Sequence, residues 1–262
     1  MSVESPPSPA RTVTACLLII GNEILSGRTQ DANLAYLARG LNEVGVRLRE
    51  ARVIPDVPAT IVATVNEVRA QYDYVFTTGG IGPTHDDITA ACVARAFGLR
   101  LVLDPEARRR LEVRYREMGG QIELNEARLR MAHMPEGAVL IDNPVSAAPG
   151  FQIGNVFVMA GVPVIAQAMF DSVKHRLIGG AKVLARGINC RLAEGTIAKD
   201  LADIQADYPQ IDIGSYPFWS RGGFGVSLVL RGIDAETLDQ AVGDVSAMIT
   251  RLGGDPVEGD AS

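Results

Sequence analysis

The feature that most constrains the fold of this chain is an alternation of apolar runs with helix-like segments over its first hundred residues. The continuous apolar run Val13–Ile20 is typical of a strand buried on both faces of a parallel sheet. Strand-like segments recur at Val46–Ile54 and Tyr74–Thr78, with helix-like segments at 31–44, from Pro58 onward, and up to Gly98. Short connections between such elements predict an α/β fold with a doubly wound, mostly parallel sheet.

The pattern of the remaining chain predicts more elements of this domain and then a second, smaller domain. Further helices are expected at 105–118, 123–134 and from 163 to about 175, and strands at 138–141 and 155–160. After Gly179–Gly180 the order becomes strand, helix, strand, strand, helix, at 187–192, 196–207, 211–217, 225–231 and 235–252. This order predicts a ferredoxin-like α+β domain. We therefore expect a disordered tail at 1–10, the two domains at 11–179 and 180–255, and a frayed tail at 256–262.

Charge and composition exclude several functional classes. The 262 residues carry 25 Lys and Arg against 31 Asp and Glu, a net charge of −6, which disfavours a nucleic-acid-binding protein. No apolar run approaches the roughly 18–20 residues that a membrane helix requires, so no membrane partner is expected. The cysteines are widely spaced and the chain starts without a secretory signal, which favours a reduced, cytoplasmic compartment. These cysteines are Cys16, Cys92 and Cys190.

The segment that carries recognisable chemistry follows the third predicted strand and reads GGIGPTHDDIT over residues 79–89. Glycines allow positive φ and a close approach of the backbone to a ligand, and the start of the next helix favours a phosphate. The adjacent carboxylates Asp86 and Asp87 would repel a bare phosphate. A divalent cation that bridges carboxylate and phosphate oxygens removes this repulsion. The segment therefore predicts a metal-assisted phosphate or pyrophosphate site.

Two further turns are expected at the same edge of the sheet, because ligands of open α/β sheets bind beyond the carboxyl ends of the strands. Glu23 follows the first strand and Asp56 the second. We expect Asp87, with Asp86, to hold Mg²⁺, Mn²⁺ or Co²⁺, and Asp56 or Glu23 to complete the metal shell or orient the attacking water. Backbone amides and hydroxyls are expected to contact the phosphates or nucleotide at Asn22, Thr78, Gly79, Gly80, Gly82, Thr84, Gly161 and Pro163.

Each of these assignments has a simpler structural alternative. Asp86 or Asp87 could cap the following helix, and Asp56 and Asp31 could each cap theirs. His85 has no cysteine or second histidine nearby, so a zinc site is not expected. Trp219 is either an exposed interface residue or, by preference, a core anchor. Neither glycine loop has the spacing of a dinucleotide-binding or P-loop motif.

The motifs resemble the MoaB/Mog-type molybdopterin-binding domain. The resemblance rests on GNEILSG at 21–27, DAN at 31–33 and the segment 77–89, and continues through PEGA at 135–138, APGF at 148–151 and GVP at 161–163. Within that family, the sequence most resembles the amino-terminal domain of CinA and the molybdopterin-binding domain of eukaryotic FAD synthases. The resemblance covers about residues 13–178, with Ala160 where the family has a proline. GSYP at 214–217 resembles the segment that follows in the FAD synthases.

This resemblance implies a cytoplasmic homo-oligomer, a dimer or trimer, that binds a nucleotide or pterin at a rim of glycines and acids. The CinA and FAD-synthase branches imply metal-dependent hydrolysis of a nucleotide diphosphate such as FAD or ADP-ribose. The molybdenum-cofactor branch implies molybdopterin as a ligand, with adenylyl transfer as the reaction. A non-catalytic binding module is the third possibility. The chemistry read from the residues fits the first two equally, because both act at a phosphoanhydride.

Overall fold

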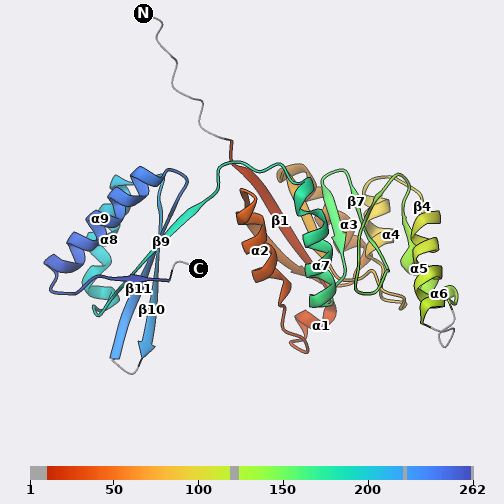
Figure 1. The fold of residues 1–262 in the computed structure, drawn as a ribbon, viewed down its shortest axis with the longest axis horizontal. Coiled ribbons are helices and arrows are strands. Elements are labelled where there is room, and N and C mark those ends of the chain that lie inside the picture. The colour runs from red at the N-terminus through yellow and green to blue at the C-terminus, as the bar shows by residue number, and fades with distance from the viewer. Residues whose placement is uncertain (1–10, 119–123, 221–222, 261–262) are drawn as a thin grey trace, which may run out of the picture. The chain divides into compact units, whose positions relative to one another are not determined.

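The chain forms two compact units in the computed structural model, which describes residues 11–118, 124–220 and 223–260. The first unit ends at Gly180 and the second begins at Ala181 (Figure 1). Two apolar clusters lie in the first unit and a third in the second, so each unit has a core of its own.

The first unit is built on a six-stranded sheet in the order β2-β1-β3-β8-β7-β6. Its strands are β1 (Val13–Ile20), β2 (Val46–Ile54), β3 (Tyr74–Thr78), β6 (Val139–Ile141), β7 (Gly150–Ile153) and β8 (Val156–Met159). The pairs β1–β2, β1–β3 and β3–β8 are parallel, and β7 pairs antiparallel with β8 and β6. The predicted α/β fold with a mostly parallel sheet is therefore confirmed.

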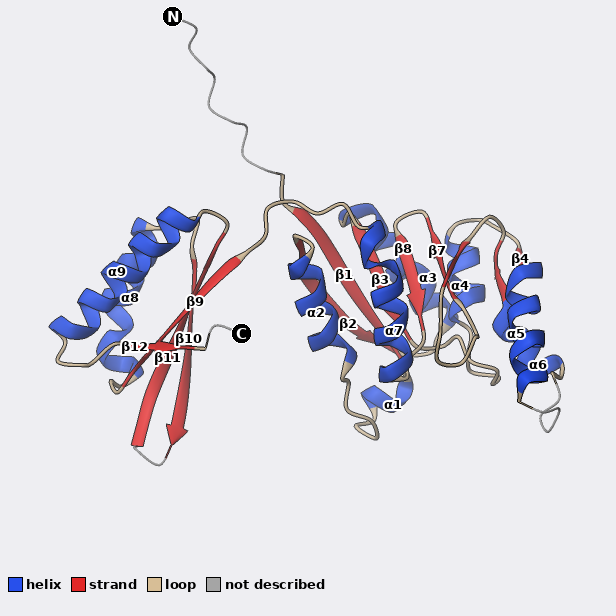
Figure 2. Cartoon of the chain, viewed as in Figure 1, coloured by secondary structure: helices blue, strands red, loops and turns tan. Residues whose placement is uncertain are grey.

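Helices cover both faces of this sheet. Successive side chains of a strand point to opposite faces, and those of residues 15–20 in β1 are apolar and buried on both. The helices are α1 (Asn22–Leu25), α2 (Asn33–Glu43), α3 (Pro58–Gln71), α4 (Thr89–Ala96), α5 (Pro105–Glu117) and α7 (Pro163–Val173), which continues into η2 (Lys174–Arg176). Ala15, Leu17 and Ile19 of β1 pack with α2 and α7, whereas the residues between them pack with α3, α4 and α5 (Figure 2). A sheet covered on both faces is the doubly wound arrangement that the sequence predicted.

The helix predicted over 123–134 is wrong. The described part of this segment contains α6 (Glu126–Leu129), η1 (Arg130–Ala132) and β5 (His133–Pro135), while residue 123 lies outside the description. β5 pairs with β4 (Leu101–Leu103), and neither strand was predicted. Pro135 disfavours a helical conformation at the residue before it, and the distant β4 provides a partner for extended backbone.

The second unit contains β9 (Leu184–Cys190), α8 (Glu194–Asp207), β10 (Asp212–Ser220), β11 (Gly223–Gly232), α9 (Ala235–Arg251) and β12 (Val257–Gly259). Its antiparallel sheet has the order β10-β11-β9-β12, which is the ferredoxin-like arrangement. The stretch 256–262, expected to be frayed, supplies the edge strand β12. Residues 261–262 lie outside the described part of the chain.

Trp219 is not a core anchor, because 81% of its surface is exposed. It lies on β10 opposite Phe224 of β11, and the two rings stack with their centroids 6.5 Å apart. The strands thus extend to Ser220 and Gly223, beyond the predicted strand ends at 217 and 225.

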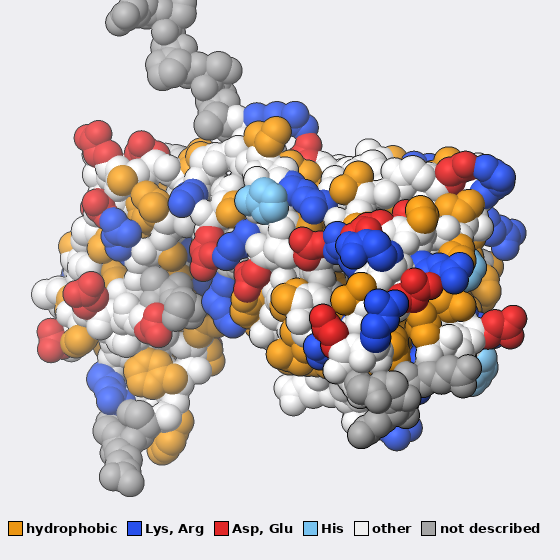
Figure 3. All heavy atoms as spheres, turned by 45° about the vertical axis from the view of Figure 1, so that its right-hand side comes forward, with side chains coloured by type: hydrophobic (Ala, Val, Ile, Leu, Met, Phe, Trp, Pro, Cys, Tyr) orange, Lys and Arg blue, Asp and Glu red, His pale blue; other side chains and the backbone are white. Residues whose placement is uncertain are grey.

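On the face of the molecule in Figure 3, acidic and basic side chains are interspersed. Within the described residues, every helix is too short or too polar to cross a bilayer.

Candidate active site

The candidate site lies where the strand order of the large sheet reverses. β2 lies on one side of β1 and β3 on the other, so the direction in which successive strands are added to the sheet reverses between β1 and β3. Ligands of open α/β sheets bind at this point, beyond the carboxyl ends of the strands. A cavity of about 520 Å³ is present there, within the usual size range of small-molecule sites. It is lined by Glu23, Thr29, Gly79–Pro83, Asp87, Met131, Asn143, Ser146, Ala148, Ala160–Pro163 and Ile165.

The glycine turn after β3 has a shape that only glycine permits. Gly79 and Gly80 have φ of 103° and 67°. A Cβ at Gly79 would lie 2.1 Å from the Ile20 carbonyl oxygen, and one at Gly80 would lie 2.1 Å from Thr89 Oγ1. The Gly79 amide donates to the Met159 carbonyl at 3.1 Å, so it is not available for the predicted phosphate contact. Gly80 and Gly82 also line the cavity, and the described structure shows no hydrogen bond from either amide.

Of the two adjacent aspartates, only Asp87 lines the cavity. Its Oδ2 accepts hydrogen bonds from the Thr84 amide, at 2.8 Å, and from the Thr84 hydroxyl, which closes the turn. Thr84 itself does not line the cavity, and the side chain of Asp86 is 63% exposed. The hydroxyl of Thr84 is the largest influence lowering the pKa of Asp86. The capping alternative is wrong for both aspartates, because α4 has Ile88 as its N-cap and no side-chain cap.

Glu23 and Asp56 follow the neighbouring strands β1 and β2, but only one of the two lines the cavity. Glu23 lines the cavity, and its carboxylate folds back over Gly21, where an added Cβ would lie 2.5 Å from Oε1. Asp56 does not line the cavity, and its Oδ2 accepts the amide hydrogen of Asn22 at 2.8 Å. Asp56 does not cap α3, whose N-cap is Val57 without a side-chain bond. It therefore anchors the turn that carries Glu23, and Asn22 contributes its backbone to this anchor.

A smaller cavity of about 50 Å³ lies beside the first and shares Glu23, Thr29, Gly161 and Pro163 with it. Thr78 lines this smaller cavity, is 1% exposed, and has no hydrogen-bond partner for its hydroxyl within the described structure. Asn33 also lines it and donates from Nδ2 to the Gly161 carbonyl at 2.9 Å. Asn33 thus joins the loops after β1 and β8, and Thr78 lines the smaller cavity but not the main one.

The N-cap of α2 is Ala32, without a side-chain cap, but Asp31 directly before it accepts a hydrogen bond from the first turn, which is the contact that the capping alternative expected. The Oδ1 of Asp31 accepts the amide hydrogen of Leu34 at 2.8 Å in the first turn of α2.

The sequence did not single out Asn143, which shapes the loop that forms one wall of the cavity. Its side chain is 6% exposed, and its Nδ2 donates to Ser146 Oγ at 2.6 Å and to the Ala148 carbonyl at 2.8 Å. Its Oδ1 accepts the amides of Val145 and Ser146, both at 3.1 Å. An asparagine within a loop of small residues is the available signal, since this side chain commonly organises turns. The apolar wall contributed by Met131 and Ile165 also went unpredicted.

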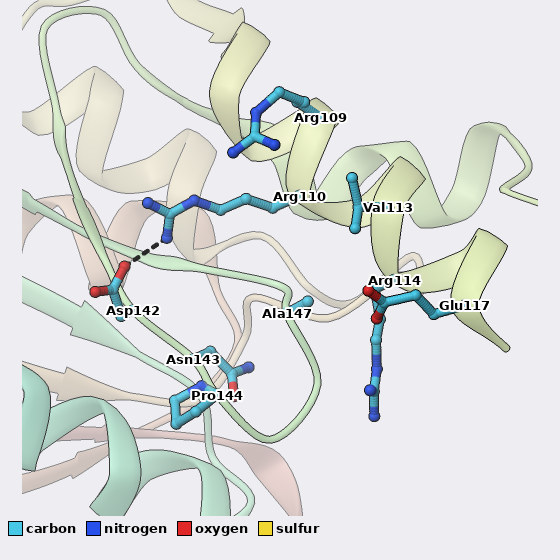
Figure 4. A pocket seen from close by; sticks show the side chains of 9 residues that line it. All are labelled: Arg109, Arg110, Val113, Arg114, Glu117, Asp142, Asn143, Pro144 and Ala147. Carbon is cyan, nitrogen blue, oxygen red and sulfur yellow. Dashed lines mark hydrogen bonds and ion pairs between the residues drawn. The ribbon is translucent and has the colours of Figure 1, made fainter.

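A second cavity, of about 450 Å³, lies between α5 and the loop from Asp142 to Ala147 (Figure 4). Its arginines are largely neutralised by neighbouring acids. Arg109 and Arg110 both pair with Glu106, and Arg110 also reaches Asp142. The pairs with Glu106 have the i,i+3 and i,i+4 spacing that is common on solvated helix faces. We therefore place the candidate chemistry in the cavity at the strand reversal, where Glu23 and Asp87 have no ion-pair partner within the described residues.

The cavity suits a hard cation only when a bound ligand shares in holding it. The described residues contain no group of three or more His, Cys, Asp or Glu that could hold a metal. Glu23 and Asp87 offer carboxylate oxygens, the donors that Mg²⁺ prefers, and Mg²⁺ is commonly held by one or two carboxylates with substrate phosphates and water. These two residues therefore fit a cation that also contacts a phosphate.

The fold and cavity define an open α/β domain with a ligand site at the strand reversal, followed by a ferredoxin-like domain. The chain belongs to the molybdopterin-binding domain family: the model described as "Probable molybdopterin binding domain" matches residues 16–179. A second model, "FAD synthase, middle domain", matches residues 182–253.

Several relatives share both parts of the chain. A protein of Archaeoglobus fulgidus is 34% identical over 86% of this chain and 93% of its own length. A CinA-like protein of Desulfosudis oleivorans is 33% identical over 94% of this chain but 61% of its own length. A probable FAD synthase of Caenorhabditis elegans is 31% identical over 91% of this chain and 50% of its own. This chain therefore spans only part of the CinA-like protein and of the FAD synthase.

The crystal structure of CinA from Thermoplasma acidophilum is similar in fold to part of this chain. It is 31% identical, matches with a TM-score of 0.57, and covers 62% of this chain and 98% of its own.

Proposed function

We propose that this protein hydrolyses the phosphoanhydride bond of a nucleotide diphosphate of the FAD or ADP-ribose type, with a divalent cation. The observation that carries the proposal is the position of Glu23 and Asp87 in one cavity with the glycine turn of β3. Acids beside backbone amides suit a ligand whose phosphates share a cation with the protein. The similarity to a probable FAD synthase supports FAD as a ligand of this class.

We assign a role to each group from its position relative to the cavity. Asp87, held by Thr84, would bind the cation, and the exposed Asp86 would contribute to its outer shell. The amides of Gly80 and Gly82 would hold a phosphate, with Gly161 and Pro163 forming the facing wall. The bound cation would neutralise charge on the phosphates.

Glu23, which lines the cavity, would orient the attacking water and accept its proton, and Asp56 holds the turn that carries Glu23. The water oxygen forms a bond to one phosphorus while that phosphorus loses its bond to the bridging oxygen. The two products are phosphate monoesters, and the bridging oxygen stays with the leaving phosphate.

The experiment that tests this function is incubation of the purified protein with FAD or ADP-ribose and Mg²⁺, Mn²⁺ or Co²⁺, with the products identified by mass. We expect AMP together with FMN or ribose phosphate. No cleavage of either compound with any of the three cations would contradict the proposal.

Molybdopterin-linked adenylyl transfer is the second candidate, favoured by the family model that matches residues 16–179. Incubation with ATP and molybdopterin distinguishes the two, since an adenylylated pterin would assign the protein to that reaction. Binding without turnover in either assay would indicate the non-catalytic module. A homo-oligomeric state and a cytoplasmic location stay predictions.

A further inference from the structure

The main cavity has an unbalanced charge for the ligand proposed here. The described residues that line it include the carboxylates of Glu23 and Asp87, and no Lys or Arg. A diphosphate brings further negative charge, and one shared cation offsets only part of it. A positively charged side chain at the rim would therefore strengthen binding, especially one that can form charge-assisted hydrogen bonds to phosphate oxygens.

Arg130 is the positively charged side chain that contacts the loop carrying Asp87. It is the first residue of η1, and its Nη1 donates to the Thr84 carbonyl oxygen at 3.5 Å. Thr84 in turn holds Asp87, and the residue after Arg130, Met131, lines the cavity. The side chain of Arg130 is exposed, and the described residues include no carboxylate paired with it. A guanidinium has five N–H donors, so most of them are free to bind a ligand.

Neighbouring arginines are engaged elsewhere or lack such a contact. The guanidinium of Arg128 lies over the ring of Tyr115, 5.4 Å from its centroid, and Arg114 reaches the Val145 carbonyl from the side of the second cavity. Arg28 precedes the lining residue Thr29, but no hydrogen bond ties it to the glycine turn in the described structure.

We propose that Arg130 binds the phosphate groups of the nucleotide diphosphate at the rim of this cavity. The inference rests on the proposed function, because it presumes a ligand with two linked phosphates. Arg130 would donate planar, paired hydrogen bonds to phosphate oxygens. Asp87 would hold the cation, and the cation would contact the same phosphates. Its effect is therefore on substrate binding, and the proton transfer stays with Glu23.

Calorimetric titration with inorganic pyrophosphate and Mg²⁺ tests this role without requiring turnover. We expect Arg130→Ala to weaken binding by about tenfold to a hundredfold, the usual loss for a charge-assisted hydrogen-bonding group. Arg130→Lys should bind pyrophosphate with an affinity between those of the wild-type protein and Arg130→Ala, because lysine keeps the charge but cannot form the paired hydrogen bonds of a guanidinium. Arg116→Ala is the matched control: it removes an exposed arginine of α5 that does not line the cavity, and binding should change by less than about twofold.

Three results would overturn the role of Arg130. These are equal binding by the Arg130→Ala and Arg116→Ala variants, a loss confined to Arg28→Ala, and failure of the wild-type protein to bind pyrophosphate. Urea unfolding of each variant checks the fold, and Arg130→Gln replaces Arg130→Ala if that variant is unstable. Pyrophosphate binding that depends on Arg130, without hydrolysis of FAD or ADP-ribose, would refute only the proposed function.

Discussion

At the residue scale, Gly79 has little tolerance for a side chain. Its φ of 103° disfavours any L residue, and the atom nearest an added Cβ is a backbone oxygen that cannot rotate away. We expect Gly79→Ala to lower the free energy of unfolding by at least about 2 kcal/mol, measured by urea denaturation. Gly243→Ala is the control: this glycine lies inside α9 with open space around it, so the same change should stabilise by about 1 kcal/mol. Equal effects at the two sites would contradict the geometry of the turn.

Asp73 gives a residue-scale prediction about pH. The hydrogen bond from the Thr14 amide, supported by the Thr14 hydroxyl and opposed by burial, holds the pKa of Asp73 below its ordinary 3.8. Because the folded pKa is the lower one, the stabilisation is complete above the unfolded pKa and is lost as pH falls through the folded value.

Asp73→Asn should therefore destabilise the protein by about 1 kcal/mol at pH 7, and by less at pH 3. Urea unfolding at the two pH values measures both numbers. A difference between variant and wild type that stays constant with pH would show that the charge of Asp73 has no role.

At the element scale, the loop 143–148 depends on one buried side chain. Asn143 makes four hydrogen bonds within this loop, which forms a wall of the main cavity. We expect Asn143→Ala to lower the free energy of unfolding by about 1–3 kcal/mol and to raise KM for the diphosphate substrate, because partly buried backbone groups of the loop lose their hydrogen-bond partner. Urea denaturation and steady-state kinetics measure the two effects. Asn66→Ala, at an exposed position of α3, should change neither, and a matching loss there would contradict the assignment.

How far elements are predictable from this sequence depends on where their stabilising contacts lie. The bounds of β1 follow from its own continuous apolar run and agree with the structure. By contrast, β5 and β12 have three residues each and depend on pairing with distant strands, so their local patterns carry little signal. The same distinction between local and distant contacts applies to the candidate site. The sequence predicts that Glu23, Asp56 and Asp87 meet at one sheet edge, but the hydrogen bond from Asn22 that draws Asp56 away is a tertiary contact.

At the scale of the whole molecule, the two units have separate cores. Every buried residue of the third apolar cluster belongs to the second unit, whereas the main cavity is lined entirely from the first. A chain ending at Gly180 should therefore fold cooperatively and bind pyrophosphate as the full chain does. Circular dichroism during thermal unfolding, with calorimetry for binding, measures this. Failure of the shorter chain to fold would show that the first unit needs the second.

The measurement that tests the central claim most directly is the rate of AMP release from FAD and ADP-ribose by the wild-type protein and by Asp87→Asn, at saturating Mg²⁺. Asparagine keeps an acceptor for the Thr84 amide, so the turn should stay folded while the carboxylate charge is lost. We predict a loss of at least about a hundredfold for Asp87→Asn, and a smaller loss for Asp86→Asn, whose side chain is outside the cavity wall. Unchanged AMP release by a folded Asp87→Asn variant would contradict the assignment of this cavity as the hydrolytic site.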